Sequence, residues 1–264
     1  MQMTLATGWK CRCVLALCAG LQPCLAAAEL TLNGGAEYLR WNESSSPNVR
    51  ETGPLYTLGI AYTQDRDAGS LFAYRGKLWG GRVNYDGATL FGSTPADGTT
   101  DYIGADNEMQ ARWRKPGATA GNIDGVLGIG LSVWRRKLSN VQKEDYATAY
   151  LRLGVESGTD DAGQWTASMG LKYPLWTYEN AHFDQIGFDS NPILHPAREV
   201  SPYGSLGYRF TPKFQVVGYY DGFRFGQSTA VQANEIAHGL GPTTLQQPAT
   251  SMSTFGIRFE YRLR

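Results

Sequence analysis

Cysteine is missing from nearly the whole sequence. All four cysteines, Cys11, Cys13, Cys18 and Cys24, lie near the start of the 264-residue chain. Long apolar runs are missing as well, because no later stretch approaches the roughly 20 apolar residues of a membrane-spanning helix. Neither sign of charge dominates, with 24 basic and 24 acidic residues. These absences argue against a small disulfide-stapled domain, a helical membrane protein and a strongly basic nucleic-acid-binding protein.

The first 28 residues have the pattern of a secretory signal peptide. Lys10 and Arg12 precede an apolar stretch, residues 13–28, which ends in three alanines before Glu29. Because such leaders are cleaved, we expect a signal peptide over residues 1–28 and a mature chain over residues 29–264. Loss of Lys10 and Arg12 leaves 22 basic and 24 acidic residues, a net charge of −2. An alternative is acylation of Cys24, although Gln22 and Pro23 fit a lipidation motif poorly.

Strict alternation of apolar and polar residues is the main pattern that is present. Near the end of the chain, Phe255, Ile257, Phe259, Tyr261 and Leu263 alternate with glycine and charged residues. A period of two indicates an extended strand with one apolar face. Nine earlier segments show a similar pattern, over residues 30–41, 55–63, 69–90, 101–114, 123–135, 146–156, 163–177, 200–210 and 214–225. The sequence therefore predicts an all-β fold with about ten strands.

The connections between these segments alternate between long and short. The predicted long connections are residues 42–54, 91–100, 136–145, 178–199 and 226–251, whereas those between them are only a few residues each. Long connections at one end and short turns at the other are typical of transmembrane β-barrels. From Leu30 to its end the chain resembles the bacterial outer-membrane β-barrel class. One departure is the terminus, Tyr261-Arg262-Leu263-Arg264, where that class usually ends in Phe.

The resemblance implies a single antiparallel up-and-down barrel in the outer membrane of a Gram-negative bacterium. It further implies a monomer that contacts outer-membrane lipid and is inserted by the barrel insertion machinery, without a nucleic-acid partner. A soluble barrel or sandwich with its apolar faces turned inward remains the alternative fold. That alternative does not account for the unequal connections.

Seven aromatic residues are predicted near the periplasmic ends of their strands, on the apolar face. Aromatic side chains at this level form a girdle at the membrane interface. The predicted girdle consists of Tyr62, Phe72, Trp113, Trp165, Phe210, Phe214 and Tyr261.

The opposite, polar face carries charges of both signs. The predicted lumen-lining residues are Arg75, Lys77, Glu108, Arg112, Arg152, Lys172, Arg209, Arg258 and Glu260. Side chains just fill a barrel of about eight strands, so ten strands leave little free bore. Two interpretations stay open: a structural network of salt bridges that fills the interior, and a narrow porin-like path for small solutes lined by arginines.

Candidate catalytic residues are few. The three histidines, His182, His195 and His238, all fall in predicted outer loops. His182 with Asp184 is the nearest match to the Asp–His pair of the omptin proteases, but in reverse order and without a second Asp pair. A metal site formed by His182, Asp184, Asp189 and His195 is conceivable by ligand type, but these residues lack any recognised metal-binding spacing. We therefore predict no catalytic residue, no metal and no cofactor, with a rim hydrolase as the least favoured function.

The two longest loops differ in composition. Residues 178–199 contain Phe183, Ile186, Phe188, Ile193 and Leu194, which suggests a lid over the barrel mouth or a docking patch. Residues 226–251 have little to bury, and we expect them to be mobile or to fold inward as a plug. The favoured function is accordingly a structural or loop-mediated binding barrel at the cell surface.

Overall fold

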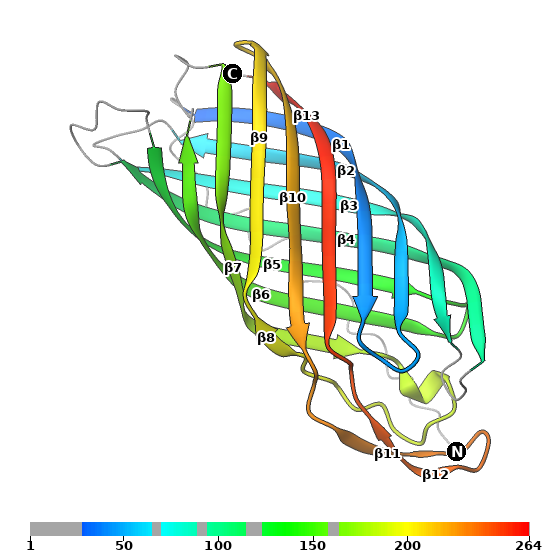
Figure 1. The fold of residues 1–264 in the computed structure, drawn as a ribbon. Coiled ribbons are helices and arrows are strands. Elements are labelled where there is room, and N and C mark those ends of the chain that lie inside the picture. Colours follow the sequence, from blue (N-terminus) through cyan, green and yellow to red (C-terminus); the bar gives the residue numbers. More distant parts are fainter. Residues whose placement is uncertain (1–27, 65–69, 89–93, 115–122, 158–163, 264) are drawn as a thin grey trace, which may run out of the picture.

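Ten long antiparallel strands form a closed barrel in the computed structural model, which describes residues 28–64, 70–88, 94–114, 123–157 and 164–263 (Figure 1). They are β1 (Ala28–Glu43), β2 (Val49–Gln64), β3 (Ser70–Ala88), β4 (Pro95–Arg114), β5 (Ile123–Lys137), β6 (Lys143–Ser157), β7 (Trp165–Asn180), β9 (Ser201–Thr211), β10 (Phe214–Gly226) and β13 (Thr250–Arg262). Each strand pairs with the next, and β13 closes the ring against β1, from Thr31 opposite Arg262 to Glu43 opposite Thr250. The prediction of a ten-stranded up-and-down barrel is confirmed. No helix in the described ranges is both long and apolar enough to cross a membrane.

Three of the five connections predicted to be long are shorter than predicted, because the strands continue into them. The β1–β2 pairing runs to Glu43 opposite Val49, and the β5–β6 pairing runs to Lys137 opposite Lys143. The β3–β4 pairing runs to Ala88 opposite Pro95. Polar residues near these tips suggested loops, but Glu43, Glu51, Thr100, Arg136 and Glu144 among them are buried. The signal peptide and the turns at residues 65–69, 115–122 and 158–163 lie outside the described residues.

The two remaining outer connections fold against each other. The first contains η1 (Phe183–Gln185) and β8 (Ala197–Glu199), and the second forms a hairpin of β11 (Val231–Glu235) and β12 (Gly241–Leu245). One buried cluster joins them, consisting of Ala181, Phe183, Phe188, Leu194, Ala233 and Leu245. The hairpin lies beyond the barrel rim, at the bottom of Figure 1. The second loop is therefore neither an inward plug nor short of residues to bury, since it covers the apolar residues of the first.

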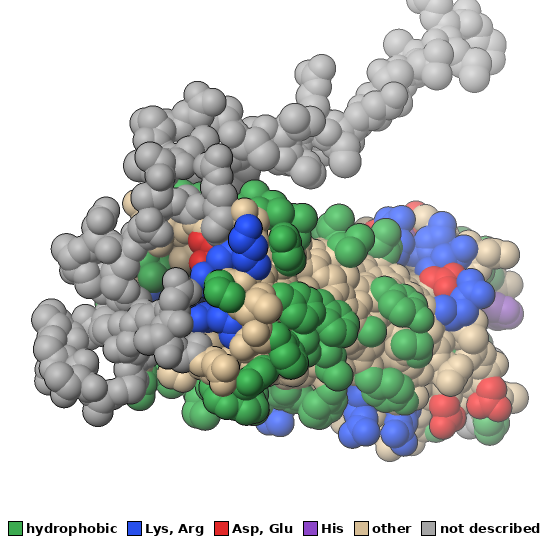
Figure 2. Space-filling model, turned by 90° about the horizontal axis from the view of Figure 1, so that it is seen from above, with side chains coloured by type: hydrophobic (Ala, Val, Ile, Leu, Met, Phe, Trp, Pro, Cys, Tyr) green, Lys and Arg blue, Asp and Glu red, His purple; other side chains and the backbone are tan. Residues whose placement is uncertain are grey.

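The outside of the barrel wall is apolar. Leu58 is 70% exposed, Ile103 is 67% exposed and Met169 is 64% exposed, each in the middle part of its strand. Figure 2 shows hydrophobic side chains spread over the middle of the barrel flank, with charged side chains mostly toward the two ends. A water-soluble protein rarely exposes so large a contiguous apolar surface. The alternative with inward-turned apolar faces is therefore contradicted.

Candidate functional site

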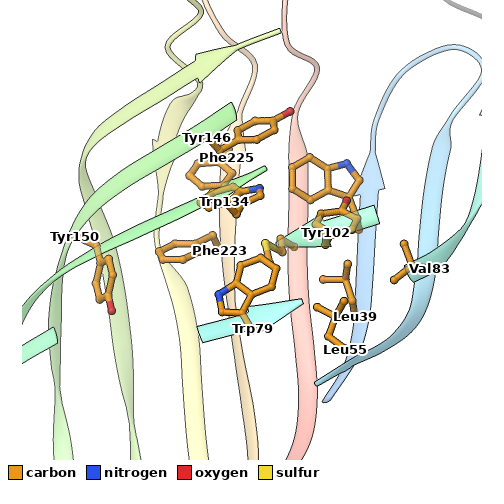
Figure 3. Close-up of a cluster of buried hydrophobic side chains, with 12 residues drawn as sticks. Leu39, Leu55, Trp79, Val83, Tyr102, Trp134, Tyr146, Tyr150, Phe223 and Phe225 are labelled. Carbon is orange, nitrogen blue, oxygen red and sulfur yellow. The ribbon is translucent and has the colours of Figure 1, made fainter. Parts of the chain in front are cut away.

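A layer of large side chains closes the barrel interior. We call it the aromatic plug (Figure 3); its members are Leu39, Trp41, Leu55, Trp79, Val83, Tyr102, Trp134, Tyr146, Tyr150, Phe223, Phe225 and Met252. Trp41 in β1 meets Tyr146 in β6 with ring centroids 5.5 Å apart. Four strands separate β1 from β6 in either direction around the ring, so this contact crosses the full width of the barrel. Trp134 and Tyr150 meet Phe223 of β10 at 6.3 Å and 5.3 Å.

Glycines in the wall make room for these rings. A Cβ atom at Gly104 would come well under 3.0 Å from the indole of Trp79, and one at Gly130 equally close to the ring of Tyr150. Side chains here would displace the rings, because interiors are already close-packed. Gly130 therefore has the packing role that its place in a strand favours.

Ion pairs fill the interior between the plug and the short-turn end, and they contain most residues of the predicted lumen set. Arg75 and Arg112 contact Glu156 at 3.5 Å and 3.3 Å, and Arg152 contacts Glu108 at 3.4 Å. The remaining pairs are Lys77 with Glu37 (3.3 Å) and Asp106 (3.2 Å), Lys172 with Asp221 (2.6 Å) and Arg258 with Glu260 (2.5 Å). Arg209 is buried. A cavity of about 120 Å³ is left among these side chains.

A second charged group lies above the plug, at the outer rim. Arg136 donates through Nη1 to Glu43 at 2.8 Å and to Glu144 at 2.7 Å, and through Nη2 to Glu51 at 2.7 Å. Plug side chains donate to the same carboxylates: Trp41 Nε1 to Glu43 at 2.7 Å, the Tyr146 hydroxyl to Glu144 at 2.8 Å, and the Tyr102 hydroxyl to Glu51. We call Glu43, Glu51, Glu144 and Glu179, with Arg136 among them, the rim carboxylate cluster.

Sequence reasoning missed this cluster, because all five of its members lie in stretches interpreted as loops. The available signal was alternation, since residues 136 and 144 continue the inward series of their strands. Glu179 is 1% exposed, and its Oε2 atom has no hydrogen-bond partner among the described residues. Its backbone exchanges two 2.9 Å hydrogen bonds with Leu194, which ties the end of β7 to the first outer loop.

A cavity of about 700 Å³ lies above the cluster, and we call it the outer vestibule. Its floor includes Glu43, Arg136, Glu144 and Glu179. Apolar residues of the first outer loop form part of the wall, and the rest comes from the rim and the second loop. The apolar wall residues include Val49, Ala181, Phe183, Ile186, Leu194 and Pro248. A volume of this size, with mixed polar and apolar lining, is within the range of small-molecule sites, roughly 300–1,000 Å³.

His182 does not pair with Asp184, the nearest match that the sequence offered to a catalytic Asp–His pair. His182 Nε2 lies 2.9 Å from Asp145 Oδ2, not beside Asp184, so the proposed His182–Asp184 pair is wrong. Asp145 also accepts two hydrogen bonds from Arg135, at 2.6 Å and 2.8 Å.

The other loop residues considered as metal ligands have separate partners. His195 Nδ1 lies 2.6 Å from the carbonyl oxygen of Thr177. Asp189 accepts hydrogen bonds from the backbone and side-chain nitrogens of Asn234 at 2.9 Å and 2.7 Å. The Asn234 amide holds the pKa of Asp189 below its usual range. Within the described ranges, no group of three or more His, Cys, Asp or Glu side chains is arranged to hold a metal ion.

The seven predicted girdle residues each lie within two residues of the short-turn end of their strand. Phe72, Trp113, Trp165, Phe210 and Tyr261 are exposed. Tyr62 and Phe214 are half-buried, and Phe214 packs at 6.0 Å from Phe210. The girdle's contact with the membrane interface stays a prediction.

Closure of the sheet together with its apolar exterior decides the class of the protein. A closed ring satisfies the backbone hydrogen bonds of every strand, which a lipid environment demands, and its exposed apolar wall suits hydrocarbon. The chain is a bacterial outer-membrane β-barrel.

Comparison with known proteins adds likenesses of fold. No protein-family model matches the sequence, and no curated protein matches it in sequence. The outer membrane protease OmpT of Escherichia coli is similar in structure, with 11% identity, a TM-score of 0.49 and coverage of 89% of this chain and 96% of that one. The translocator domain of the autotransporter NalP from Neisseria meningitidis has 15% identity and a TM-score of 0.40, with 89% and 88% covered. The outer membrane protein OprG from Pseudomonas aeruginosa has 13% identity and a TM-score of 0.36, with 89% and 96% covered.

Proposed function

We propose that this barrel is a closed, non-enzymatic surface protein that binds a small ligand in the outer vestibule. The observation that carries the proposal is the order of layers along the barrel axis. A cavity of about 700 Å³ faces the outer loops, and the aromatic plug lies directly beneath it. The plug closes the inner end of the vestibule and separates it from the rest of the lumen, so that a ligand can enter from outside but not pass through.

The narrow-channel alternative is less well supported. The contact between Trp41 and Tyr146 spans the barrel at one level. Below it, Arg75, Arg112 and Arg152 of the predicted arginine-lined path are held by carboxylates that lie two or three strands away around the ring. Buried ion pairs of this kind are costly to break, because removing one partner leaves the other charge uncompensated. These arginines therefore serve the interior packing better than a solute path.

The hydrolase alternative is also less well supported. A histidine that activates a nucleophile or water must be oriented by a group that leaves its reactive nitrogen available to the substrate. Asp145 orients His182 through Nε2 as in an Asp–His pair, but Arg135 already holds that carboxylate in a two-point contact, and the sequence offers no second Asp pair. This arrangement is an ion-pair network that ties the first outer loop to β6.

Electrical recording tests whether the barrel is closed. The folded protein is inserted into planar lipid bilayers beside a variant that lacks three plug rings, Trp41→Ala with Tyr146→Ala and Phe223→Ala. We expect the unmodified protein to be silent, because the plug and the ion pairs beneath it fill the lumen, and conductance of the variant alone would identify the plug as the main barrier. Conductance steps of the same size for both proteins would contradict the proposal, and heat-dependent gel mobility verifies that both are folded barrels.

A further inference from the structure

We infer that the outer vestibule binds a small organic cation, namely a primary ammonium or guanidinium group carried on an apolar body. This inference rests on the proposed function of the vestibule as a binding site. It is carried by three features of the cavity: an excess of negative charge in its floor, one carboxylate oxygen without a donor, and apolar walls above them.

The rim carboxylate cluster holds four glutamates but one basic side chain among the described residues that contact it. The guanidinium of Arg136 makes its ion pairs with Glu43, Glu51 and Glu144. Even with Glu179 protonated, the other three carboxylates give the cluster a net charge of −2. Glu43, Glu144 and Glu179 line the cavity itself. Charges confined at the floor of a partly enclosed cavity concentrate counter-ions there, because the low-dielectric walls focus the field.

Glu179 shows independently where a ligand would attach. Its side chain is almost completely buried, its Oε2 atom lacks a hydrogen-bond partner among the described residues, and it lines the cavity. Buried polar atoms in native structures nearly always have a partner, and leaving one without a partner is costly. A ligand N–H group in the vestibule supplies the missing donor. A cationic donor is favoured over a neutral one because charge-assisted hydrogen bonds are stronger.

The walls define the rest of the ligand. Phe183, Ile186 and Leu194 approach from the first outer loop, and Val49 approaches from the start of β2. Phe183 and Leu194 also belong to the buried cluster that joins the two outer loops, so these walls are built into the fold. Apolar walls favour an aromatic or aliphatic body and offer little to a hydrated metal ion. An aryl-alkyl ammonium compound has both required parts.

Binding of two matched probes tests the inference. The probes are 2-phenylethylammonium and 2-phenylethanol, which share their apolar body and differ in charge. Each is titrated against the folded full-length protein in detergent by calorimetry, with tryptophan fluorescence as a second readout. The same titrations use Glu179→Gln, which keeps the shape of the side chain, and Glu260→Gln, which removes a carboxylate at the far end of the lumen. Heat-dependent gel mobility verifies folding of each variant.

We expect the ammonium probe to bind at least about tenfold more tightly than the alcohol, the equivalent of about 1.4 kcal/mol. Glu179→Gln should remove most of that difference while leaving the alcohol unaffected, and Glu260→Gln should match the unmodified protein. Equal binding of both probes, or a preference that survives Glu179→Gln, would overturn the cationic ligand but leave a binding vestibule in place. Binding of neither probe, or tight calcium binding that excludes the ammonium, would also overturn the inference. Conductance of the unmodified barrel is the separate result that contradicts the proposed function.

Discussion

Replacing Arg136 by methionine should destabilise the barrel strongly. Arg136 is 2% exposed and pairs with three glutamates from β1, β2 and β6. Methionine keeps most of the apolar stem of the side chain but removes the charge and all of its donors. The three carboxylates then stay buried with only their neutral donors, such as the indole of Trp41 and the hydroxyl of Tyr146.

The expected loss follows from burial. Removing one partner of a buried ion pair costs ~3–5 kcal/mol, chiefly because the remaining charge is uncompensated. A matched control is Arg82→Met in β3. Arg82 also makes two hydrogen bonds to one carboxylate, that of Asp101, at 2.6 Å and 3.1 Å. Its side chain is 67% exposed, and exposed pairs contribute ~1 kcal/mol or less.

Urea unfolding in lipid–detergent mixtures, followed by circular dichroism, measures both effects as shifts of the midpoint. A further variant adds Glu43→Gln and Glu144→Gln to Arg136→Met, and it should recover part of the lost stability because two of the three stranded charges are gone. Equal losses for Arg136→Met and Arg82→Met would refute the reasoning, as would a failure of the glutamine replacements to restore any stability.

Three further perturbations test other parts of the structure. Leu58→Arg on the mid-strand outer face should impair folding into vesicles by ~2–4 kcal/mol, whereas Leu240→Arg in the exposed outer hairpin should have little effect; equal effects would argue against a lipid-facing wall. Gly104→Ala should cost ~1–3 kcal/mol in urea unfolding because its Cβ meets a buried indole, and Gly98→Ala, which meets nothing within 4 Å, should be neutral. Asp189 has a lowered pKa, so its contribution to loop docking is full above its unfolded pKa of about 3.9 and is lost as the pH falls through the folded value. Limited acid proteolysis should therefore release the outer loops at low pH, and Asp189→Asn should abolish that dependence.

The strand pattern could be predicted because it is local. Residues such as Leu58 and Ile257 repeat every second position, and a lipid environment requires one uniform apolar face along each strand. This requirement holds whichever strands are neighbours, so the number of strands and the closed topology followed from the alternation and the spacing of the segments. The outward faces were predicted for the same reason.

The inward faces could not be predicted to the same depth. Glu43, Glu51, Arg136 and Glu144 are far apart in sequence, and they meet only because the register and closure of the barrel bring four strands to one rim. The plug depends likewise on β1 and β6 lying opposite each other, which places Trp41 against Tyr146. Alternation predicts whether a side chain faces the lumen or the outside of the barrel. Its partner, and therefore its role as packing, ion pair or ligand contact, depends on distances across the lumen that arise only when the ring is closed.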